Sequence, residues 1–394
     1  MSEWKEKTLG ELSIRVSSGL TPLKSNKEFW ENPIIPWLKT DQLGEKYIFD
    51  TNTKISKEAL EQTSLRIYPE NTISIAMYGE GKTRGNLSII KAPMTTNQAC
   101  CNIELDTKLA DVEYVYYYLK TQYDALRKLS SGVRKNLSSN DIKNYKIYIP
   151  ESVSFQKSIV RILTSLDNKI SVNNQINQEL EAMAKTLYDY WFVQFDFPDQ
   201  NGKPYKSSGG KMVYNPELKR EIPEGWGVTK VGELQIATGK RDANFGTENG
   251  KYDFWTTANS PIKADEFSFE GKAILIAGNG NFYVNFTEGK FEAYQRTYVI
   301  QSEDENMLIF MYMACLQSVE KLRKGSNGSI IKYITIGDVN NIASPYNKNV
   351  VNEFVRIYSP LIDLISKNKR QNQELTQLRD WLLPMLMNGQ VKVE

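Results

Sequence analysis

Residues 154–192 read SFQKSIVRILTSLDNKISVNNQINQELEAMAKTLYDYWF, and neither Gly nor Pro interrupts them. Their apolar residues mostly recur at every third or fourth position, which is the spacing of one helix face. These residues are Ile159, Ile162, Leu166, Ile170, Ile176, Leu180, Met183, Leu187 and Trp191, and Asn173 lies on the same stripe. The pattern predicts a helix roughly 55 Å long. Its narrow apolar stripe suits a partner helix better than a broad core.

The composition is that of a folded globular protein. The chain has 394 residues, 40% of them hydrophobic and 24% charged, and it is long enough for two or more domains. The net charge is only +2, so binding to nucleic acid would depend on local groups and not on a global field. The sequence contains no histidine, which excludes His-based catalysis and His metal ligands.

Signals for membranes and for oxidising compartments are absent from the sequence. The longest uncharged apolar run, Met307–Val319, is shorter than the roughly 20 residues that cross a bilayer. The N-terminal residues MSEWKEKTLGEL lack the apolar core of a signal peptide. Three cysteines, Cys100, Cys101 and Cys315, make neither a disulfide framework nor a metal cluster. We therefore expect a cytoplasmic protein that does not associate with a membrane.

The two halves of the chain resemble one another in sequence. Similar motifs recur in the same order, and the last two pairs below share one constant offset. The pairs are Trp4 and Gly10–Leu12 with Trp226 and Gly232–Leu234, Ile73–Ala76 with Ile274–Ala277, Ser131–Lys135 with Gly328–Lys332, Asp141–Asn144 with Asp338–Asn341, Val160–Ile162 with Val355–Ile357, and Asn177–Leu180 with Asn372–Leu375. Because chance similarity would not preserve this order, we infer a duplicated unit made of a mixed domain followed by a long helix.

The repeat predicts an α+β chain with two mixed α/β domains in tandem. Short apolar runs such as 72–77 and 144–149 read as strands between Gly, Asn and Pro, and 112–129 reads as a helix. The expected segments are a first domain at 1–152, a central long helix at 153–195, a connector at 196–223, a second domain at 224–349 and a C-terminal long helix at 350–394.

The C-terminal helix is the expected partner of the central helix. Its stripe carries Leu361, Ile365, Leu375, Leu378 and Leu382, and Asn368 lies at the repeat position of Asn173. A polar residue in such a seam commonly fixes the register. Pro360 should kink or break this helix near its start. The residues expected to pair the helices and to dock other subunits are Ile159, Leu166, Ile170, Asn173, Leu180, Leu187, Leu361, Ile365, Asn368, Leu375 and Leu382.

These stretches resemble the specificity subunits of type I restriction-modification systems. The similarity lies in 159–192, in the connector with Phe197-Pro198 and Asn201–Gly210, in Glu221–Trp226, and in Asn372–Leu375 with Leu378-Arg379 and Leu382–Pro384. It is strong in the helices and the connector and weak in the two mixed domains. The resemblance implies that the helices are a scaffold and that the two domains are variable target-recognition domains.

The family resemblance implies an architecture and a set of partners. Two target-recognition domains are separated by two long helices packed as an antiparallel coiled coil, and each domain reads one half of a bipartite, asymmetric site in double-stranded DNA. The helices set the spacer and dock two methyltransferase (modification) subunits. No cofactor is expected in this chain: S-adenosylmethionine belongs to the methyltransferase, and ATP and Mg²⁺ belong to motor-nuclease (restriction) subunits.

Three pairs of loops are candidates for DNA contact. The first pair is the basic loop with Lys82, Arg84 and Asn86 and the amide-rich and aromatic loop with Asn279, Asn281 and Tyr283. The second is Asn97-Gln98 and Gln295-Arg296, since Asn and Gln read adenine and Arg reads guanine. The third is Arg134-Lys135 with Asn327, Lys332 and Tyr333, which suit phosphates. The alternative for every one of them is an ordinary solvated turn.

The sequence gives little support for base stacking by aromatic residues or for catalysis by this chain. Core packing explains most of Trp30, Trp37, Tyr116, Tyr117, Tyr118 and Trp255 better than base stacking does. The chain has no Asn-Pro-Pro-Tyr or Asp-Pro-Pro-Tyr run for amino methylation and no complete nuclease motif around Pro198-Asp199. We therefore predict a subunit without catalytic or metal-binding residues. Two alternatives stay open: an assembly scaffold that does not read DNA, and an enzyme with a carboxylate-based site.

Overall fold

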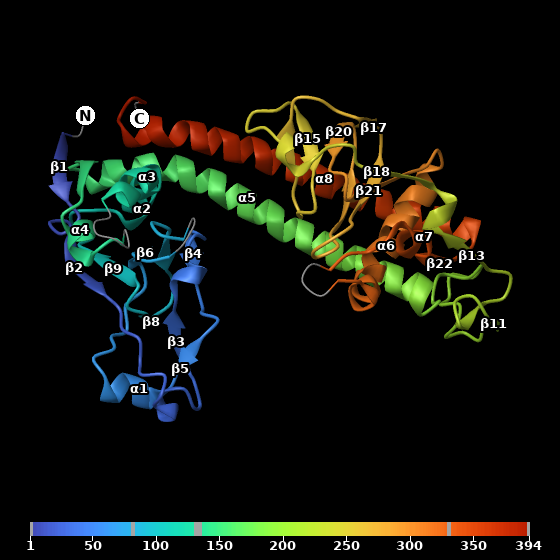
Figure 1. Cartoon of the computed structure of the whole chain (residues 1–394), viewed down its shortest axis with the longest axis horizontal. Helices are drawn as coiled ribbons and strands as arrows, with labels where there is room; N and C mark the ends of the chain where they lie inside the picture. The colour runs from blue at the N-terminus through green and yellow to red at the C-terminus, as the bar shows by residue number, and fades with distance from the viewer. Residues whose placement is uncertain (1–2, 80–82, 130–135, 329–331, 392–394) are drawn as a thin grey trace. The chain divides into compact units, whose positions relative to one another are not determined.

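The computed structural model describes residues 3–79, 83–129, 136–328 and 332–391. The chain divides into two compact units (Figure 1). The first comprises Met1–Ser171 with Asn372–Glu394, and the second comprises Val172–Gln371. Each unit therefore contains a mixed domain and one part of each long helix. Among the described residues, none of the helices is both long enough and apolar enough to span a membrane.

The first unit is built on a five-stranded sheet. Its strand order is β2-β9-β6-β7-β4, and all pairs are antiparallel except β4 with β7. The strands are β2 (Ser13–Ser18), β4 (Tyr47–Ile48), β6 (Ile73–Ala76), β7 (Leu87–Ile90) and β9 (Cys100–Leu105). The side chains of Ile73, Ile75 and Ile103 are fully buried. Burial of a side chain of this size contributes about 1.5–3 kcal/mol, so this sheet anchors the unit.

Smaller elements complete the first unit. Strands β3 (Ile35–Leu38), β5 (Lys54–Ile55) and β8 (Thr95–Thr96) form a second sheet, and β1 (Trp4–Thr8) pairs with β10 (Lys146–Pro150). Helices α1 (Lys57–Gln62), α2 (Val112–Thr121), α3 (Tyr123–Lys128) and α4 (Ser139–Lys143) fill the connections. The helix predicted at 112–129 is thus two helices, because Gln122 leaves the helical conformation at φ −97° and ψ 9°.

The second unit has the same plan. Its main sheet has the order β14-β21-β18-β19, a second sheet has the order β16-β15-β20-β17, and β13 pairs with β22. The strands are β13 (Gly227–Lys230), β14 (Gln235–Thr238), β15 (Tyr252–Trp255), β16 (Ile262–Ala264), β17 (Phe269–Glu270), β18 (Ala273–Ala277), β19 (Val284–Thr287), β20 (Lys290–Ala293), β21 (Thr297–Gln301) and β22 (Ala343–Tyr346). Helices α6 (Glu305–Gly325) and α7 (Ile336–Asn340) follow the main sheet.

The structure confirms the duplication that the sequence predicts. Helix α4 begins with a capping box between Ser138 and Asp141, and α7 begins with one between Thr335 and Asp338. A Cβ atom on Gly10 would lie 3.1 Å from the Lys143 carbonyl oxygen, and one on Gly232 would lie 3.2 Å from the Asn340 carbonyl oxygen. The repeated glycines therefore permit the same close approach of the chain to the end of the capped helix in both units.

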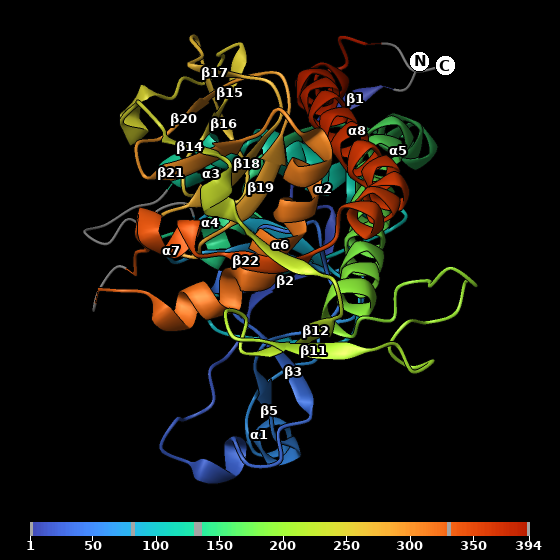
Figure 2. The same cartoon turned by 90° about the vertical axis from the view of Figure 1, so that its right-hand side faces the viewer.

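The connector folds as part of the second unit. It contains the two-stranded hairpin of β11 (Met212–Asn215) and β12 (Arg220–Pro223), which Figure 2 shows. The ring of Phe197 stacks on Tyr205 with 4.8 Å between centroids and lies 4.9 Å from Trp226. These aromatic contacts hold the glycine-rich segment between them in an ordered conformation.

Both predicted long helices are present. Helix α5 spans Val153–Tyr188 and continues as a π-helical turn over Asp189–Val193, and α8 spans Lys348–Met387. Of the kink or break predicted at Pro360, the break is wrong, because α8 runs through this residue as one element. Pro360 is exposed while Tyr358 and Ile362 beside it are buried. Its ring and the carbonyl group that it leaves unbonded can therefore face solvent, while its neighbours hold the helix in place.

The helices pair antiparallel within each unit. In the second unit the Asn173 amide donates to Gln371 at 2.8 Å, and the Asn368 amide donates to Asn177 at 2.9 Å. In the first unit the Arg379 guanidinium donates to Asp167 at 2.9 Å. Along these contacts the residue number increases in α5 as it decreases in α8, so the two helices run in opposite directions. Asn173 and Asn368, the two polar residues predicted in the seam, are both buried.

The phase of the predicted stripe is partly wrong. Ile162, Ile176 and Met183 of the central helix are 36%, 39% and 58% exposed, and Leu378 of the C-terminal helix is 43% exposed. Asn177 and Ala184, each one position after an exposed stripe residue, are buried instead. The other predicted pairing residues lie on the inner side: Ile159 and Ile365 are buried, and Leu166, Ile170, Leu180, Leu187, Leu361, Leu375 and Leu382 are half-buried. The prediction assumed that apolar residues mark the seam. In the middle of the seam, however, Asn177 and Asn368 are buried and bond to one another across the helices, so the seam is polar there.

The Asn177–Asn368 bond yields a double-mutant prediction. Asn177→Leu leaves the buried Asn368 amide without its partner and should destabilise the second unit by about 1–3 kcal/mol. Replacing both residues by Leu should restore most of that loss, because no buried polar group is then left unpaired. Chemical denaturation of the two single variants and the double variant measures this. Additive losses in the double variant would show that the two amides do not act as a pair.

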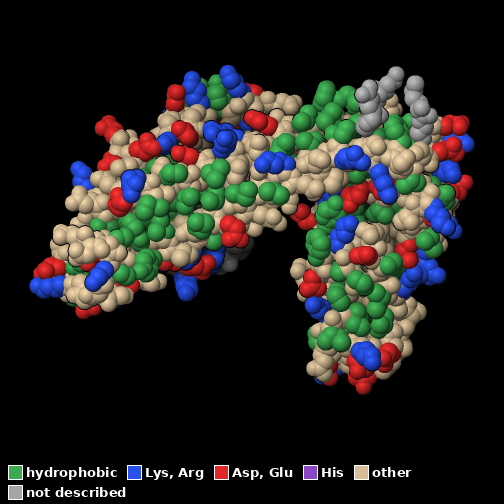
Figure 3. All heavy atoms as spheres, turned by 180° about the vertical axis from the view of Figure 1, so that it is seen from behind, with side chains coloured by type: hydrophobic (Ala, Val, Ile, Leu, Met, Phe, Trp, Pro, Cys, Tyr) green, Lys and Arg blue, Asp and Glu red, His purple; other side chains and the backbone are tan. Residues whose placement is uncertain are grey.

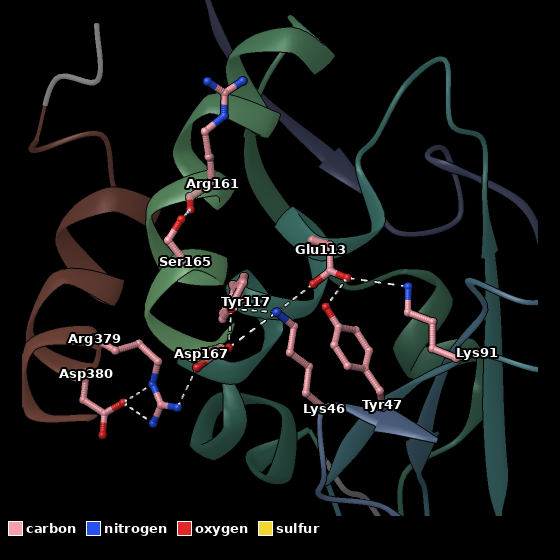
Figure 4. Close-up of polar contacts among 10 residues, drawn as sticks. All are labelled: Lys46, Tyr47, Lys91, Glu113, Tyr117, Arg161, Ser165, Asp167, Arg379 and Asp380. Atoms are coloured by element: carbon pink, nitrogen blue, oxygen red, sulfur yellow. Dashed lines mark hydrogen bonds and ion pairs between the residues drawn. The ribbon is translucent and has the colours of Figure 1, made fainter. Parts of the chain in front are cut away.

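A partly buried polar network joins both helices to the first sheet (Figure 4). The Lys46 ammonium lies 2.9 Å from Glu113 and 3.4 Å from Asp167, and it donates to the Tyr117 hydroxyl at 2.7 Å. Burial and the bond to Asp167 raise the pKa of Tyr117, so its hydroxyl stays protonated and donates to that carboxylate. Asp167 also accepts from Arg379, so one carboxylate of α5 joins α2, α8 and the residue that precedes β4.

Candidate nucleic-acid interface

Three of the predicted loops of the second unit converge at one end of its main sheet. The Gly278 N–H donates to the Arg296 carbonyl at 2.7 Å, and the Ile334 N–H donates to the Gly278 carbonyl at 3.0 Å. The Gly280 N–H donates to the Lys332 carbonyl at 2.9 Å. The loop after β18, the loop before β21 and the segment before α7 are therefore tied together through their backbones.

A cavity of about 380 Å³ opens between these loops. It is lined by Thr238, Gly278, Gln295, Arg296, Tyr298, Tyr333 and Ile334. Gln295, Arg296 and Tyr333 are exposed. The Tyr298 hydroxyl donates to the Ile334 carbonyl at 3.0 Å, and burial raises its pKa, so it stays protonated. The cavity presents a primary amide, a guanidinium and aromatic rings, which are groups that bond to and stack on bases.

The remaining predicted residues of this unit fall into two sets. Asn279 and Asn327 form backbone bridges to Tyr333, which places them beside the cavity, and the Lys332 side chain is exposed. Asn281 and Tyr283 bond to one another at 3.1 Å and line a different cavity, together with residues of α5, α6 and α8. The structure therefore groups Asn279, Gln295, Arg296, Asn327, Lys332 and Tyr333, and it separates Asn281 and Tyr283 from them.

In the first unit, the described candidates have mixed surroundings. Gln98 is exposed and its side-chain oxygen accepts from the Thr21 hydroxyl, which leaves the amide hydrogens of Gln98 available. The Asn97 side chain accepts from the Ala99 N–H at 3.1 Å and so holds its own turn. The Asn86 amide lies 3.4 Å from the Leu43 carbonyl, and Arg84 is half-buried. Lys82, Arg134 and Lys135 lie outside the described residues.

Gln98 and Gln295 occupy equivalent places in the two units. The Gly19 N–H donates to the Cys100 carbonyl at 3.1 Å, and the Gly239 N–H donates to the Thr297 carbonyl at 3.0 Å. Each glutamine stands two residues before the residue that accepts this bond. A Cβ atom on Gly19 or Gly239 would lie 2.2 or 2.1 Å from a carbonyl oxygen of the loop that carries the glutamine, so both positions require glycine. The sequence does carry a signal for this match, because Gly19 follows Gly10 and Gly239 follows Gly232 at similar distances. The predicted repeat did not include these two glycines.

Other side chains agree with the expectation of core packing. Trp37, Tyr116, Tyr117 and Trp255 are buried, and Trp30 and Tyr118 are half-buried. On the face that Figure 3 shows, Lys and Arg side chains are interspersed with Asp and Glu in the described part of the chain. Any preference for nucleic acid on this face would therefore come from particular loops. The described residues contain no group of three or more Cys, Asp or Glu that could hold a metal ion.

Comparison with known proteins gives one consistent family. Residues 1–182 and 223–377 both match the family model of the type I restriction modification DNA specificity domain. The type I restriction enzyme MjaIX specificity subunit of Methanocaldococcus jannaschii is 29% identical over 427 aligned residues, which cover 100% of this chain and 94% of that protein. The type I restriction enzyme EcoDI specificity subunit of Escherichia coli is 33% identical over 44% of this chain and 40% of its own length.

A solved structure shares the fold. The S subunit of the type I restriction-modification system from M. genitalium has a TM-score of 0.61 and 16% sequence identity, with 98% of this chain and 96% of that chain covered. The two matches to one family model coincide with the two structural repeats described above. The chain therefore belongs to the family of type I restriction-modification DNA specificity subunits, with two specificity domains in tandem.

Proposed function

We propose that each domain of this chain reads one half of a bipartite, asymmetric sequence in double-stranded DNA. One observation carries the proposal: a duplicated scaffold presents different exposed groups at equivalent places. The loop that carries Gln98 and Ala99 in the first unit corresponds to the loop that carries Gln295 and Arg296 in the second, so only the second presents an exposed guanidinium there. Two readers of the same fold with different side chains recognise two different half-sites, as an asymmetric sequence requires.

The chemistry of these side chains fits base edges in the major groove. A glutamine amide bonds bidentately to the N6 and N7 atoms of adenine, and an arginine guanidinium bonds to O6 and N7 of guanine. We assign Gln98 to the first half-site and Gln295 with Arg296 to the second. The Lys332 side chain is exposed beside the cavity and suits a phosphate contact, which positions the protein without specifying sequence.

The chain would supply recognition while its partners supply catalysis. The sequence lacks the Asn-Pro-Pro-Tyr and Asp-Pro-Pro-Tyr motifs of amino methyltransferases. We propose that two methyltransferase subunits dock on the helix pair α5 and α8, bind S-adenosylmethionine and extrude the target adenine from the duplex, since chemistry on a base requires that extrusion. Motor-nuclease subunits that use ATP and Mg²⁺ would join the same assembly in the bacterial or archaeal cytoplasm.

Mapping of modified adenines tests this function. The chain is expressed with the modification subunit of its own system in a host without adenine methylation, and genomic DNA is sequenced by a method that detects N6-methyladenine. We expect methylation at one bipartite motif and nowhere else. The modification subunit without this chain is the control and should leave the genome unmodified. Methylation that follows no bipartite motif would show that the chain is an assembly scaffold and not a reader.

The helix pair makes a quantitative prediction about the spacer. Seven residues inserted after Gln178 in α5, with seven inserted after Ser366 in α8, lengthen the pair by about 10 Å at 1.5 Å per residue. Base pairs rise by about 3.4 Å each, so we expect the unread spacer to lengthen by about three base pairs. The mapped motif gives the answer directly. A variant that folds and methylates at the original spacing would show that the helices are not the ruler.

A further inference from the structure

A fully buried carboxylate stands shortly before the loop that carries Gln295 and Arg296, which we call the second reading loop (residues 294–296). The carboxylate is that of Glu292, on β20, and β20 lies between β15 and β17 in its sheet (Figure 1). Its side chain is 0% exposed. A carboxylate is rarely buried without partners, because its desolvation is costly. The groups that bond to Glu292 therefore show what it holds in place.

The cation that faces Glu292 is Arg241, in the segment after β14. The Arg241 Nε atom donates to one oxygen of Glu292 at 3.3 Å, and the Ser268 hydroxyl donates to the same oxygen at 2.7 Å. The other oxygen accepts from the Ala293 N–H at 2.9 Å. The guanidinium also donates to the exposed Glu266 at 2.6 Å. Both oxygens of the buried carboxylate are bonded, and the guanidinium links it to the surface.

The backbone of Arg241 is bonded to the second reading loop. Its carbonyl accepts from the Gln295 N–H at 2.9 Å, and its own N–H donates to the Ala293 carbonyl at 3.4 Å. Because the side chain of Arg241 is fixed to Glu292, its backbone has little freedom to move. The ion pair therefore holds the backbone of Gln295 through one intervening residue.

The first unit has a different arrangement at the equivalent loop, the first reading loop (residues 97–99). Two pairs of equivalent backbone bonds align the loops: Leu20 N–H to Thr96 carbonyl with Lys240 N–H to Ala293 carbonyl, and Asn97 N–H to Leu38 carbonyl with Tyr294 N–H to Trp255 carbonyl. In this alignment Thr21 corresponds to Arg241, and Thr95 corresponds to Glu292. Two threonines therefore stand where the second unit has its ion pair.

The two threonines make neutral hydrogen bonds. The Thr95 hydroxyl donates to the Pro36 carbonyl at 2.8 Å, and the Thr21 hydroxyl donates to the side chain of Gln98. The first unit thus holds the side chain of its glutamine directly. In the second unit Arg241 turns toward Glu292 instead, and among the described residues nothing bonds to the Gln295 side chain. The position of that side chain depends on how firmly its backbone is held.

We propose that the Arg241–Glu292 ion pair positions the second reading loop for base recognition and acts through the Gln295 backbone without a base contact of its own. This inference rests on the proposed function. A bidentate base contact requires both hydrogen bonds at about 2.7–3.2 Å, so a small displacement of the loop removes most of the discrimination. A loop that is fixed before DNA binds also loses less conformational entropy on binding.

Glu292→Gln in the assembled complex tests this role. Glutamine preserves the shape and can bond to Ser268 and to the Ala293 N–H, but it lacks the charge that holds the guanidinium. We expect discrimination between the cognate second half-site and single base changes within it to fall by roughly fivefold or more, as in partial loss of a bidentate contact. Discrimination at the first half-site should not change. Fluorescence anisotropy at one salt concentration gives both ratios, and neither ratio depends on the fraction of folded protein.

Two further variants separate positioning from other effects of the lost charge. Arg241→Met combined with Glu292→Gln removes the guanidinium that the single substitution releases, so a new phosphate contact cannot explain the result. We expect the same loss of discrimination in this double variant. Glu270→Gln removes an equal charge from an exposed position on β17 and should keep full discrimination at both half-sites.

The outcomes that would overturn the proposal are specific. They are unchanged discrimination in Glu292→Gln, recovery of discrimination in the double variant, and equal losses at the two half-sites. Adenine mapping with the unaltered chain separates this inference from the proposed function. A bipartite motif together with full discrimination by Glu292→Gln would refute the positioning role alone, whereas the absence of any bipartite motif would refute both.

Discussion

Replacement of Gln295 and Arg296 by Ala is expected to weaken binding of the cognate DNA by at least roughly 30-fold. A bidentate contact to a base contributes about 1–3 kcal/mol of discrimination, and two such contacts are lost. Both side chains are exposed at the mouth of the same cavity and no described contact of their side chains holds the fold. The loss should therefore appear in DNA binding and not in stability. Fluorescence anisotropy of the assembled complex at one fixed salt concentration measures it.

The same double variant should lose preference for only one half-site. Base changes in the half read by the second domain should no longer reduce its affinity, while changes in the other half should reduce it as before. A control variant, Gln200→Ala with Lys203→Ala, removes one amide and one positive charge from exposed positions of the connector and should bind DNA normally. Equal losses in the two double variants, or loss of preference in both half-sites, would contradict the assignment.

Asp167→Ala is expected to destabilise the first unit by about 2–3 kcal/mol, somewhat less than a fully buried ion pair, because the partly buried partners of the carboxylate are left uncompensated. The Asp167 side chain is 19% exposed and that of Lys46 is 13% exposed. Removal of the Asp167 carboxylate takes away the acceptor that Lys46, Arg379 and the Tyr117 hydroxyl share. The measurement is the free energy of unfolding of the first unit, monitored by hydrogen exchange of its main sheet.

Asp380 supplies the matched control for that substitution. It also pairs with Arg379, at 2.8 Å, but its side chain is 59% exposed. Exposed ion pairs contribute about 0–1 kcal/mol, so Asp380→Ala should have little effect. Comparable losses from the two substitutions would show that burial of the network is not what makes Asp167 important.

The sequence predicts best what depends on local spacing. The long helices follow from a period of three to four residues that needs no tertiary information, and the duplication follows from motifs such as Asn177–Leu180 and Asn372–Leu375. The predicted break at Pro360 fails because helix propensity does not depend on whether a proline faces solvent or the core, and Pro360 is exposed. The stripe through Ile176 and Met183 fails because the inner positions beside them are taken by Asn177, which bonds to Asn368, and by Ala184.

The candidate site depends on contacts between distant parts of the chain. That Gln98 matches Gln295, and not Arg296, follows from hydrogen bonds made by Gly19 and Gly239, which lie far from them in sequence. That Asn281 and Tyr283 line another cavity follows from the turn after β18. Among the described strands, β4 covers β7 while β19 ends its sheet, and this difference is visible only when the two sheets are compared strand by strand. Strand order and register are set by long-range pairing, which periodicity does not reveal.

Exchange of one domain tests independent reading of two half-sites most directly. Residues 1–152 are replaced by the corresponding domain of a family member with a known, different motif, and modified adenines are mapped in a genome that expresses the chimaera with the modification subunit. We expect a new first half-site, the original second half-site and an unchanged spacer. A motif that changes in both halves would contradict the account.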